Sequence, residues 1–113
     1  MITKQKLKLK RGDDHSFRLT FKQNGAFFNL SQVARIDLQA IYRSTVVLNI
    51  STESGLIEKL SDNSILLNIP HTLTENDQWV QAQYDLQFTF RDGKVRTVME
   101  GNIELSHDIT IAR

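Results

Sequence analysis

Residues 81–105 read QAQYDLQFTFRDGKVRTVMEGNIEL, and the alternation of apolar and polar side chains in this stretch decides the fold class. Successive side chains of a strand point to opposite faces, whereas a helix repeats every 3.6 residues. The first run therefore predicts a strand with one apolar side, formed by Ala82, Tyr84, Leu86, Phe88 and Phe90. Asp92-Gly93 follows, and Gly93 favours the positive φ of a tight hairpin turn. The second run completes the predicted hairpin, with an inward side formed by Val95, Thr97, Met99, Gly101, Ile103 and Leu105.

The same period of two recurs upstream. It predicts strands over 16–22, 34–42, 46–50, 56–59 and 64–69, with Ala34 among the inward residues of the second. Between them lie turn signals, which are Asn24-Gly25, Thr52-Glu53-Ser54-Gly55 and Asp62-Asn63. Pro70 ends a strand because it cannot donate to a ladder, and 72–77 is expected to form one helical turn with Thr72 as its cap. The segment 4–10 is either a first strand or an ordered arm.

About seven to eight short strands with frequent turn signals are typical of an antiparallel, immunoglobulin-like β-sandwich, here a single domain over 1–113. The alternative, an OB-fold barrel, has only about five strands. Ala82-Gln83-Tyr84 matches part of the tyrosine corner of immunoglobulin-like domains, in which the hydroxyl bonds to the backbone just upstream. Tyr84 is therefore expected to have a structural role, and Leu86 occupies the place of the second cysteine.

Composition excludes several kinds of chemistry. The 113 residues include no cysteine, so disulfides, thiolate catalysis and cysteine-based zinc sites are excluded. The net charge of +1 gives no strong field toward nucleic acid or an anionic membrane. The first residues lack the apolar core of a signal peptide, and no apolar run approaches the ~20 residues that span a bilayer. We therefore expect a soluble, intracellular product with no membrane partner.

No set of residues has the spacing of an active site. His15, His71 and His107 each stand near a predicted strand end, where a surface position is expected. Asp13-Asp14 and 75–77 offer oxygen atoms to calcium, but neither follows a known calcium loop. The five glycines are scattered, so there is no phosphate-binding loop. The sequence predicts a protein that is not an enzyme and holds no metal or cofactor.

Several residues are candidates for an interface. The most distinct charged feature is a basic stripe, which consists of Lys4, Lys6, Lys8, Lys10 and Arg11. It either contacts phosphates or an acidic partner, or it protects an edge strand from aggregation. Trp79 either caps the sandwich or lies exposed as an interface anchor. Adjacent Phe27 and Phe28 cannot both face one core, so Phe28 is an interface candidate. Gly101 marks a bulge or a close backbone approach.

Read as a whole, the chain resembles small β-sandwich structural proteins of tailed phages and prophages. The resemblance is most specific in the C-terminal third, in Tyr84-Asp85-Leu86, Asp92-Gly93-Lys94-Val95, Gly101-Asn102-Ile103 and Ile109-Thr110. Upstream it rests on Arg11-Gly12-Asp13, Ser16-Phe17-Arg18-Leu19, Phe28-Asn29-Leu30-Ser31, Gly55-Leu56-Ile57, 64–69 and Thr72-Leu73-Thr74. Asn29 and Ser31 depart from the Asp-Leu-Thr-Gly-like turn of that family.

The resemblance implies a non-enzymatic virion protein of the tail, collar or baseplate, made in the host cytoplasm. Its implied partners are other phage structural proteins and copies of itself, because virion components assemble symmetrically. Two alternatives stay open. The first is a nucleic-acid-binding accessory protein that uses the Lys-rich segment. The second is a carbohydrate-binding module with Trp79 and Tyr42 as its aromatic platform.

Overall fold

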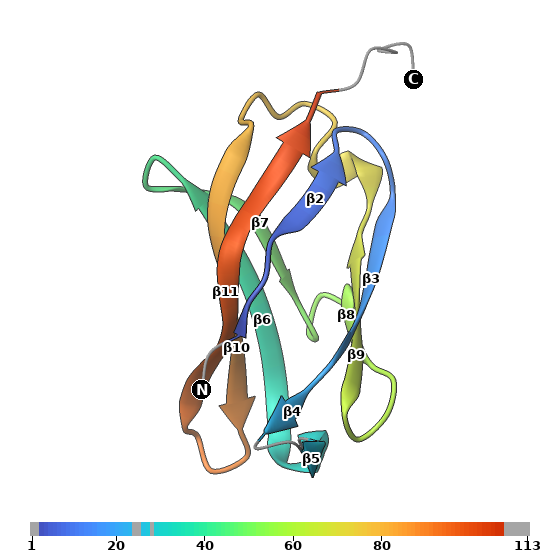
Figure 1. The fold of residues 1–113 in the computed structure, drawn as a ribbon, viewed down its shortest axis with the longest axis vertical. Helices are drawn as coiled ribbons and strands as arrows, with labels where there is room; N and C mark the ends of the chain where they lie inside the picture. Colours follow the sequence, from blue (N-terminus) through green and yellow to red (C-terminus); the bar gives the residue numbers. More distant parts are fainter. Residues whose placement is uncertain (1–2, 24–25, 28, 108–113) are drawn as a thin grey trace.

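The computed structural model describes residues 3–23, 26–27 and 29–107, which fold into two facing β-sheets (Figure 1). The large sheet has six strands, in the order β1-β11-β10-β6-β7 with β2 also on β11. These strands are β1 (Thr3–Lys4), β2 (Leu7–Lys10), β6 (Val33–Tyr42), β7 (Thr45–Ser51), β10 (Gln81–Phe90) and β11 (Val95–Ser106). The small sheet has the order β3-β9-β8, formed by β3 (His15–Thr20), β9 (Ser64–Ile69) and β8 (Ile57–Lys59).

This arrangement is an immunoglobulin-like sandwich, as the alternation predicts. The orders β11-β10-β6-β7 and β3-β9-β8 correspond to the strands G-F-C-C′ and B-E-D of that fold. β1 and β2 both pair with β11, and they do so in one continuous register, from Thr3 beside Met99 to Lys10 beside Ser106. Counted as one interrupted strand, they bring the two described sheets to eight strands. A separate two-stranded ladder, β4 (Lys22–Gln23) with β5 (Ala26–Phe27), flanks the predicted Asn24-Gly25 turn, which lies outside the described residues.

The sandwich is antiparallel as expected, except at the N-terminal edge of the large sheet. β1 and β2 run parallel to β11, whereas the other described pairs are antiparallel. A parallel pair needs a long connection, and almost the whole chain separates the first strand from the last. The structure also decides between strand and arm, because the backbone of 7–10 is part of the sheet.

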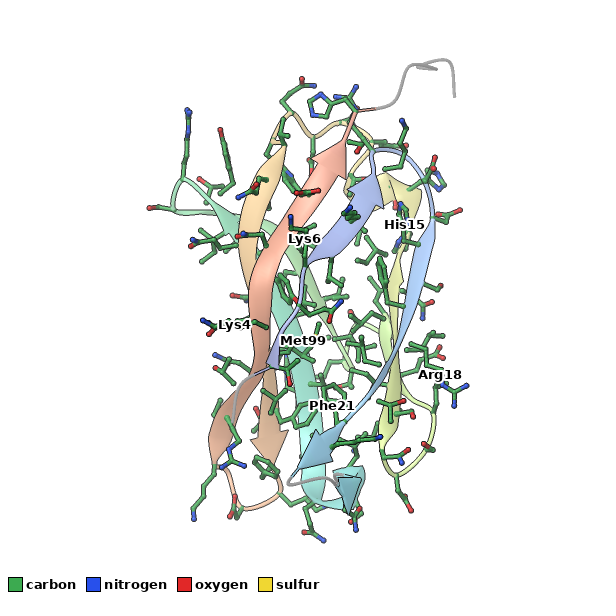
Figure 2. All side chains as sticks on the ribbon, in the orientation of Figure 1. Lys4, Lys6, His15, Arg18, Phe21 and Met99 are labelled. Carbon is green, nitrogen blue, oxygen red and sulfur yellow. The ribbon has the colours of Figure 1, made fainter. Side chains whose placement is uncertain are left out.

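One hydrophobic cluster fills the space between the sheets. Phe21 contacts Phe88 edge to face, with ring centroids 5.1 Å apart. Figure 2 shows Phe21 and Met99 directed between the two layers. The inward sides of the strands contribute in alternation, so in β10 the residues Ala82, Leu86 and Phe88 are buried while their neighbours face solvent.

The inward-facing residues predicted for β6 and β11 are partly wrong, because each of these strands contains a β-bulge. In β6, Val33 pairs with Phe90 and Arg35 with Thr89, so Ala34 is the extra residue and is exposed. In β11, Met99 pairs with Leu86 and Thr97 with Gln87, which makes Val98 the extra residue. Because successive side chains alternate between the two faces, one extra residue reverses the facing of the side chains that precede it in β11. Val95, predicted inward, is therefore 59% exposed.

Short connections close the ends of the sandwich. Gly93 has φ +90° in the predicted hairpin turn, where its amide donates to the carbonyl of Phe90 at 2.9 Å. The helical turn after Pro70 is a single 3₁₀ turn over His71–Leu73, with Pro70 and not Thr72 at its N-cap position. Its earlier start follows from Pro70, whose fixed φ and extended ψ lead directly into the turn. A second 3₁₀ turn spans Leu30–Gln32. Within the described part of the chain, no helix is long and apolar enough to cross a bilayer.

Candidate functional site

The N-terminal strand presents the basic stripe on one side. Leu7 and Leu9 are buried, so alternation directs Lys6, Lys8 and Lys10 to solvent. Figure 2 shows Lys4 and Lys6 along the exposed side of this strand, next to β11. Lys4 is exposed as well, so the four lysines form an exposed column at this edge of the sheet, as expected for the case in which 4–10 is a strand.

The stripe is partly neutralised by its neighbour in the sheet. Lys6 Nζ lies 2.9 Å from Glu104 Oε1, in the adjacent strand β11. The hydrogen bond from Lys6 and the positive charges of Lys6 and Lys8 lower the pKa of the Glu104 carboxyl. An acidic residue among the lysines weakens any attraction for phosphates. It fits an edge strand whose lysines discourage pairing with another chain.

Arg11 belongs to the end of the sandwich and does not extend the exposed stripe. Its backbone amide donates to the Ser106 carbonyl at 2.7 Å, and its guanidinium donates to the Asp77 carbonyl at 3.1 Å. The next residue, Gly12, donates its amide to Thr74 Oγ1 at 3.0 Å. These bonds join three segments, so Arg11, which was an interface candidate, has a structural role here.

Trp79 caps the sandwich and is not an exposed anchor. Its side chain is only 5% exposed, and its indole Nε1 donates to Asp77 Oδ2 at 2.8 Å. A buried indole needs such a partner, and Asp77, two residues earlier, supplies it locally. The proposed carbohydrate platform of Trp79 with Tyr42 is therefore wrong, because the indole face is covered. Phe28 lies outside the described residues.

Tyr84 and Gly101 hold the first strand in place. The Tyr84 hydroxyl donates to the backbone carbonyl of Gln5, between β1 and β2. A Cβ atom at Gly101 would collide with the same carbonyl, so the predicted close approach is confirmed. Gln5 also donates its amide to the Glu100 carbonyl at 3.0 Å. The expected tyrosine corner is wrong, since the hydroxyl bonds to the N-terminal strand and not to the chain just upstream. Burial raises the pKa of Tyr84 to about 12.

The histidines take part in local contacts. His71 Nδ1 lies 2.9 Å from Asp14 Oδ1, and the His71 amide donates to the same oxygen at 2.7 Å. These bonds lower the pKa of Asp14. His15 contacts the Lys10 backbone, and His107 contacts the Trp79 carbonyl. Over residues 3–23, 26–27 and 29–107, no three histidine or acidic side chains converge as metal ligands.

The outer face of the large sheet carries a polar hollow that sequence reasoning did not single out. It measures about 880 Å³ and lies over β6, β10 and β11. Asp85 and Glu100 face each other across the strand pair in this hollow. Partial burial and the negative charge of Glu100 raise the pKa of Asp85. The sequence does show the polar residues of the hollow, such as Gln83, Asp85 and Gln87, as the polar side of an alternating strand. Only the order of strands in the sheet brings them next to the polar residues of β6 and β11.

The strand β7 forms an open edge of the large sheet. Figure 1 shows the β6–β7 hairpin projecting from the body of the sandwich at the left. Ile41 and Val46 are cross-strand neighbours on this hairpin and are 46% and 50% exposed. The turn residues Arg43 and Ser44 have φ of 49° and 64°, as a type I′ turn requires. Sequence reasoning assigned this strand no role, although the uncharged run Thr45–Ser51 was visible.

Comparison with known proteins finds a similar fold but assigns the chain to no family. No family model and no curated protein matches the chain. Among solved structures, the chain is similar to the immunoglobulin-like domain of mouse leukocyte-associated immunoglobulin-like receptor 1, solved as a strand-swapped dimer. The two share 7% sequence identity with a TM-score of 0.49, over 88% of this chain and 86% of that domain.

Proposed function

We propose that this chain is a non-enzymatic structural or assembly protein of a tailed phage or prophage, acting through protein–protein contacts. Its place would be in the tail, collar or baseplate, after synthesis in the host cytoplasm. The observation that carries the proposal is the open outer edge of β7, a strand that pairs only with β6 among the described strands and beside which Ile41 and Val46 expose apolar surface. A sheet edge of this kind binds other chains by strand addition. The resemblance in the C-terminal third supplies the biological setting.

The arrangement of buried groups supports a structural role. The polar side chains at the ends of the sandwich bond to the chain itself, as Arg11 and Asp77 do. Trp79 closes the end of the core and Tyr84 holds the first strand. A rigid module of this kind presents fixed edges and faces to its neighbours. Such surfaces suit repeated, symmetric assembly with other virion proteins and with copies of the same chain.

The test is mass spectrometry of purified particles. Particles are prepared from an induced lysogen or an infected host that carries the gene, and then banded by density. The expected result is peptides of this chain at a constant ratio to a major structural protein across the band. Absence of those peptides from intact particles, with the protein present in the lysate, overturns the proposal.

A nucleic-acid-binding accessory role is the second candidate, favoured by the exposed column Lys4, Lys8 and Lys10. The ion pair of Lys6 with Glu104 reduces the positive charge of this surface. Binding through phosphates weakens steeply with salt. Fluorescence anisotropy with double-stranded and single-stranded DNA at low salt decides the matter. A salt-sensitive affinity that Lys8→Glu abolishes supports this role, and no binding at low salt removes it.

A further inference from the structure

The two edges of the large sheet differ in how they are protected. β7 pairs only with β6 among the described strands, and Thr45–Ser51 contains no charge, proline or glycine. The opposite edge carries an exposed lysine at every second position of 6–10. Natural edge strands commonly carry charges, prolines or a cover, because an unprotected edge pairs with another chain. The N-terminal edge is protected in this way, whereas the strand β7 offers its edge to a partner.

The hydrogen-bond pattern shows which backbone groups of β7 are open. Thr52 donates its amide to the Ile36 carbonyl at 3.0 Å. Antiparallel ladders alternate, so the N–H and C=O of Asn49 point away from β6. The type I′ turn bonds Tyr42 to Thr45, which turns the backbone of Val46 outward as well.

The lower end of the edge is closed by its own chain. Ser51 donates its amide to Ser54 Oγ at 3.1 Å, and Ser54 Oγ donates to the Ser51 carbonyl at 2.9 Å. The open part of the edge therefore runs from Val46 to Asn49. Both of these side chains are exposed, on the same outer face of the sheet as Gln39 and Ile41.

The charges that flank β7 identify a fitting partner. Exposed Arg43 precedes the uncharged strand and exposed Glu53 follows it. If two copies pair antiparallel, Val46 of each copy lies opposite Asn49 of the other. That register aligns outward-directed backbone groups and outward-facing side chains, and it brings Arg43 of each copy alongside Glu53 of the other. Parallel pairing would align like charges instead, which is unfavourable.

We propose that β7 pairs antiparallel with β7 of a second copy, giving a two-fold dimer with one continuous sheet. The contact is isologous, since the same strand acts on both sides. The dimer would cover the exposed Val46 and satisfy the open backbone groups of Val46 and Asn49. This inference rests on the proposed function in one respect, that the chain works through protein–protein contacts, and it names the first of those partners.

The first experiment is sedimentation velocity of the full chain over about 1–100 μM, the range in which specific protein contacts of ordinary strength are seen. Val46→Lys places a charge in the open edge, opposite the other copy. Val95→Lys is the matched control, because Val95 has a similar exposure of 59% but lies outside β7. We expect a dimer for the wild type and Val95→Lys, and a dissociation constant raised about tenfold or more in Val46→Lys. Circular dichroism verifies that both variants keep the sheet.

Charge reversal tests whether the two β7 strands pair antiparallel. The residues to be changed, Arg43 and Glu53, are exposed, so their substitution should leave the fold intact. Arg43→Glu and Glu53→Arg each oppose like charges and should weaken the dimer, whereas the double variant should recover most of the affinity. Glu53 also pairs with Arg35 at 2.6 Å, but an exposed pair of this kind contributes little to stability. A wild type that stays monomeric, a Val46→Lys variant that dimerises as tightly as Val95→Lys, or a double variant without recovery overturns the proposal.

These outcomes are separable from those of the virion test. A monomer in solution whose peptides are found in intact particles overturns the β7 dimer and leaves the structural role in place. A β7-dependent dimer that is absent from particles supports the dimer and overturns the phage role.

Discussion

The hydroxyl of Tyr84 donates a hydrogen bond to the backbone carbonyl of Gln5, 79 residues earlier in the chain. Tyr84 pairs with Gly101 in the neighbouring strand, and the same Gln5 carbonyl lies directly over the Gly101 Cα. Tyr84 in β10, Gly101 in β11 and Gln5 between β1 and β2 thus fix how the N-terminal segment lies alongside the last strand. The N-terminal edge of the large sheet depends on this contact.

Replacing Tyr84 with phenylalanine should loosen the N-terminal strand. The ring remains in the core, but the Gln5 carbonyl loses its donor, at a cost of about 1 kcal/mol in the free energy of unfolding. Urea unfolding measures the loss, and hydrogen exchange at 3–10 locates it. Tyr42→Phe is the control, because its ring lies under Arg43 at the hairpin, away from Gln5. Equal losses in both variants would contradict the assigned role of Tyr84.

Gly101→Ala should destabilise the sandwich by about 2 kcal/mol or more, because the new methyl group collides with the Gln5 backbone and not with a movable side chain. Gly93→Ala is a matched comparison. Its added methyl group meets nothing within 4 Å, and the cost comes from φ +90° alone, about 1 kcal/mol. Amide exchange should accelerate at residues 3–10 in Gly101→Ala but not in Gly93→Ala. The reverse pattern would show that Gly101 does not position the first strand.

Asp77→Ala should cost about 1–3 kcal/mol, because it leaves the buried indole N–H of Trp79 without an acceptor. Thermal unfolding followed by near-ultraviolet circular dichroism reports both the stability and the packing of the single tryptophan. The exposed Asp62 provides a control substitution, Asp62→Ala, that should change stability by less than about 0.5 kcal/mol. An unchanged tryptophan signal and stability in Asp77→Ala would rule out the capping bond.

Asp85→Asn should stabilise the fold near neutral pH. Burial and Glu100 raise the folded-state pKa of Asp85 above its unfolded value. The ionised carboxyl therefore costs stability above the folded-state pKa, and the cost disappears as pH falls below the unfolded value. Solvent screening keeps the gain small, a rise of about 1–4 °C in Tm at pH 7. The wild type and the variant should converge in acid, and a gain that persists there would point to another cause.

The alternating residues predicted the main strands well. The run 81–90, the turn at Gly93 and the strand Ser64–Ile69 all form as expected, because side-chain alternation and turn chemistry are local properties. The uncharged run of β7 was equally visible, but nothing local showed that this strand ends the sheet. The polar hollow around Asp85 could not be predicted either, because it is formed by three strands whose order in the sheet is not a local property.

By itself, the sequence determined that the chain is an immunoglobulin-like sandwich of short strands, and it left open whether the lysine-rich segment 4–10 is a strand or an arm. Only the tertiary structure decided that Trp79 is buried, that Tyr84 bonds to Gln5 and that one extra residue at Val98 turns Val95 outward. The physical reason is that register, sheet order and bulges arise from pairing between distant segments. Local pattern fixes which residues form a strand, whereas the pairing partner fixes which way each side chain points and which edge stays open.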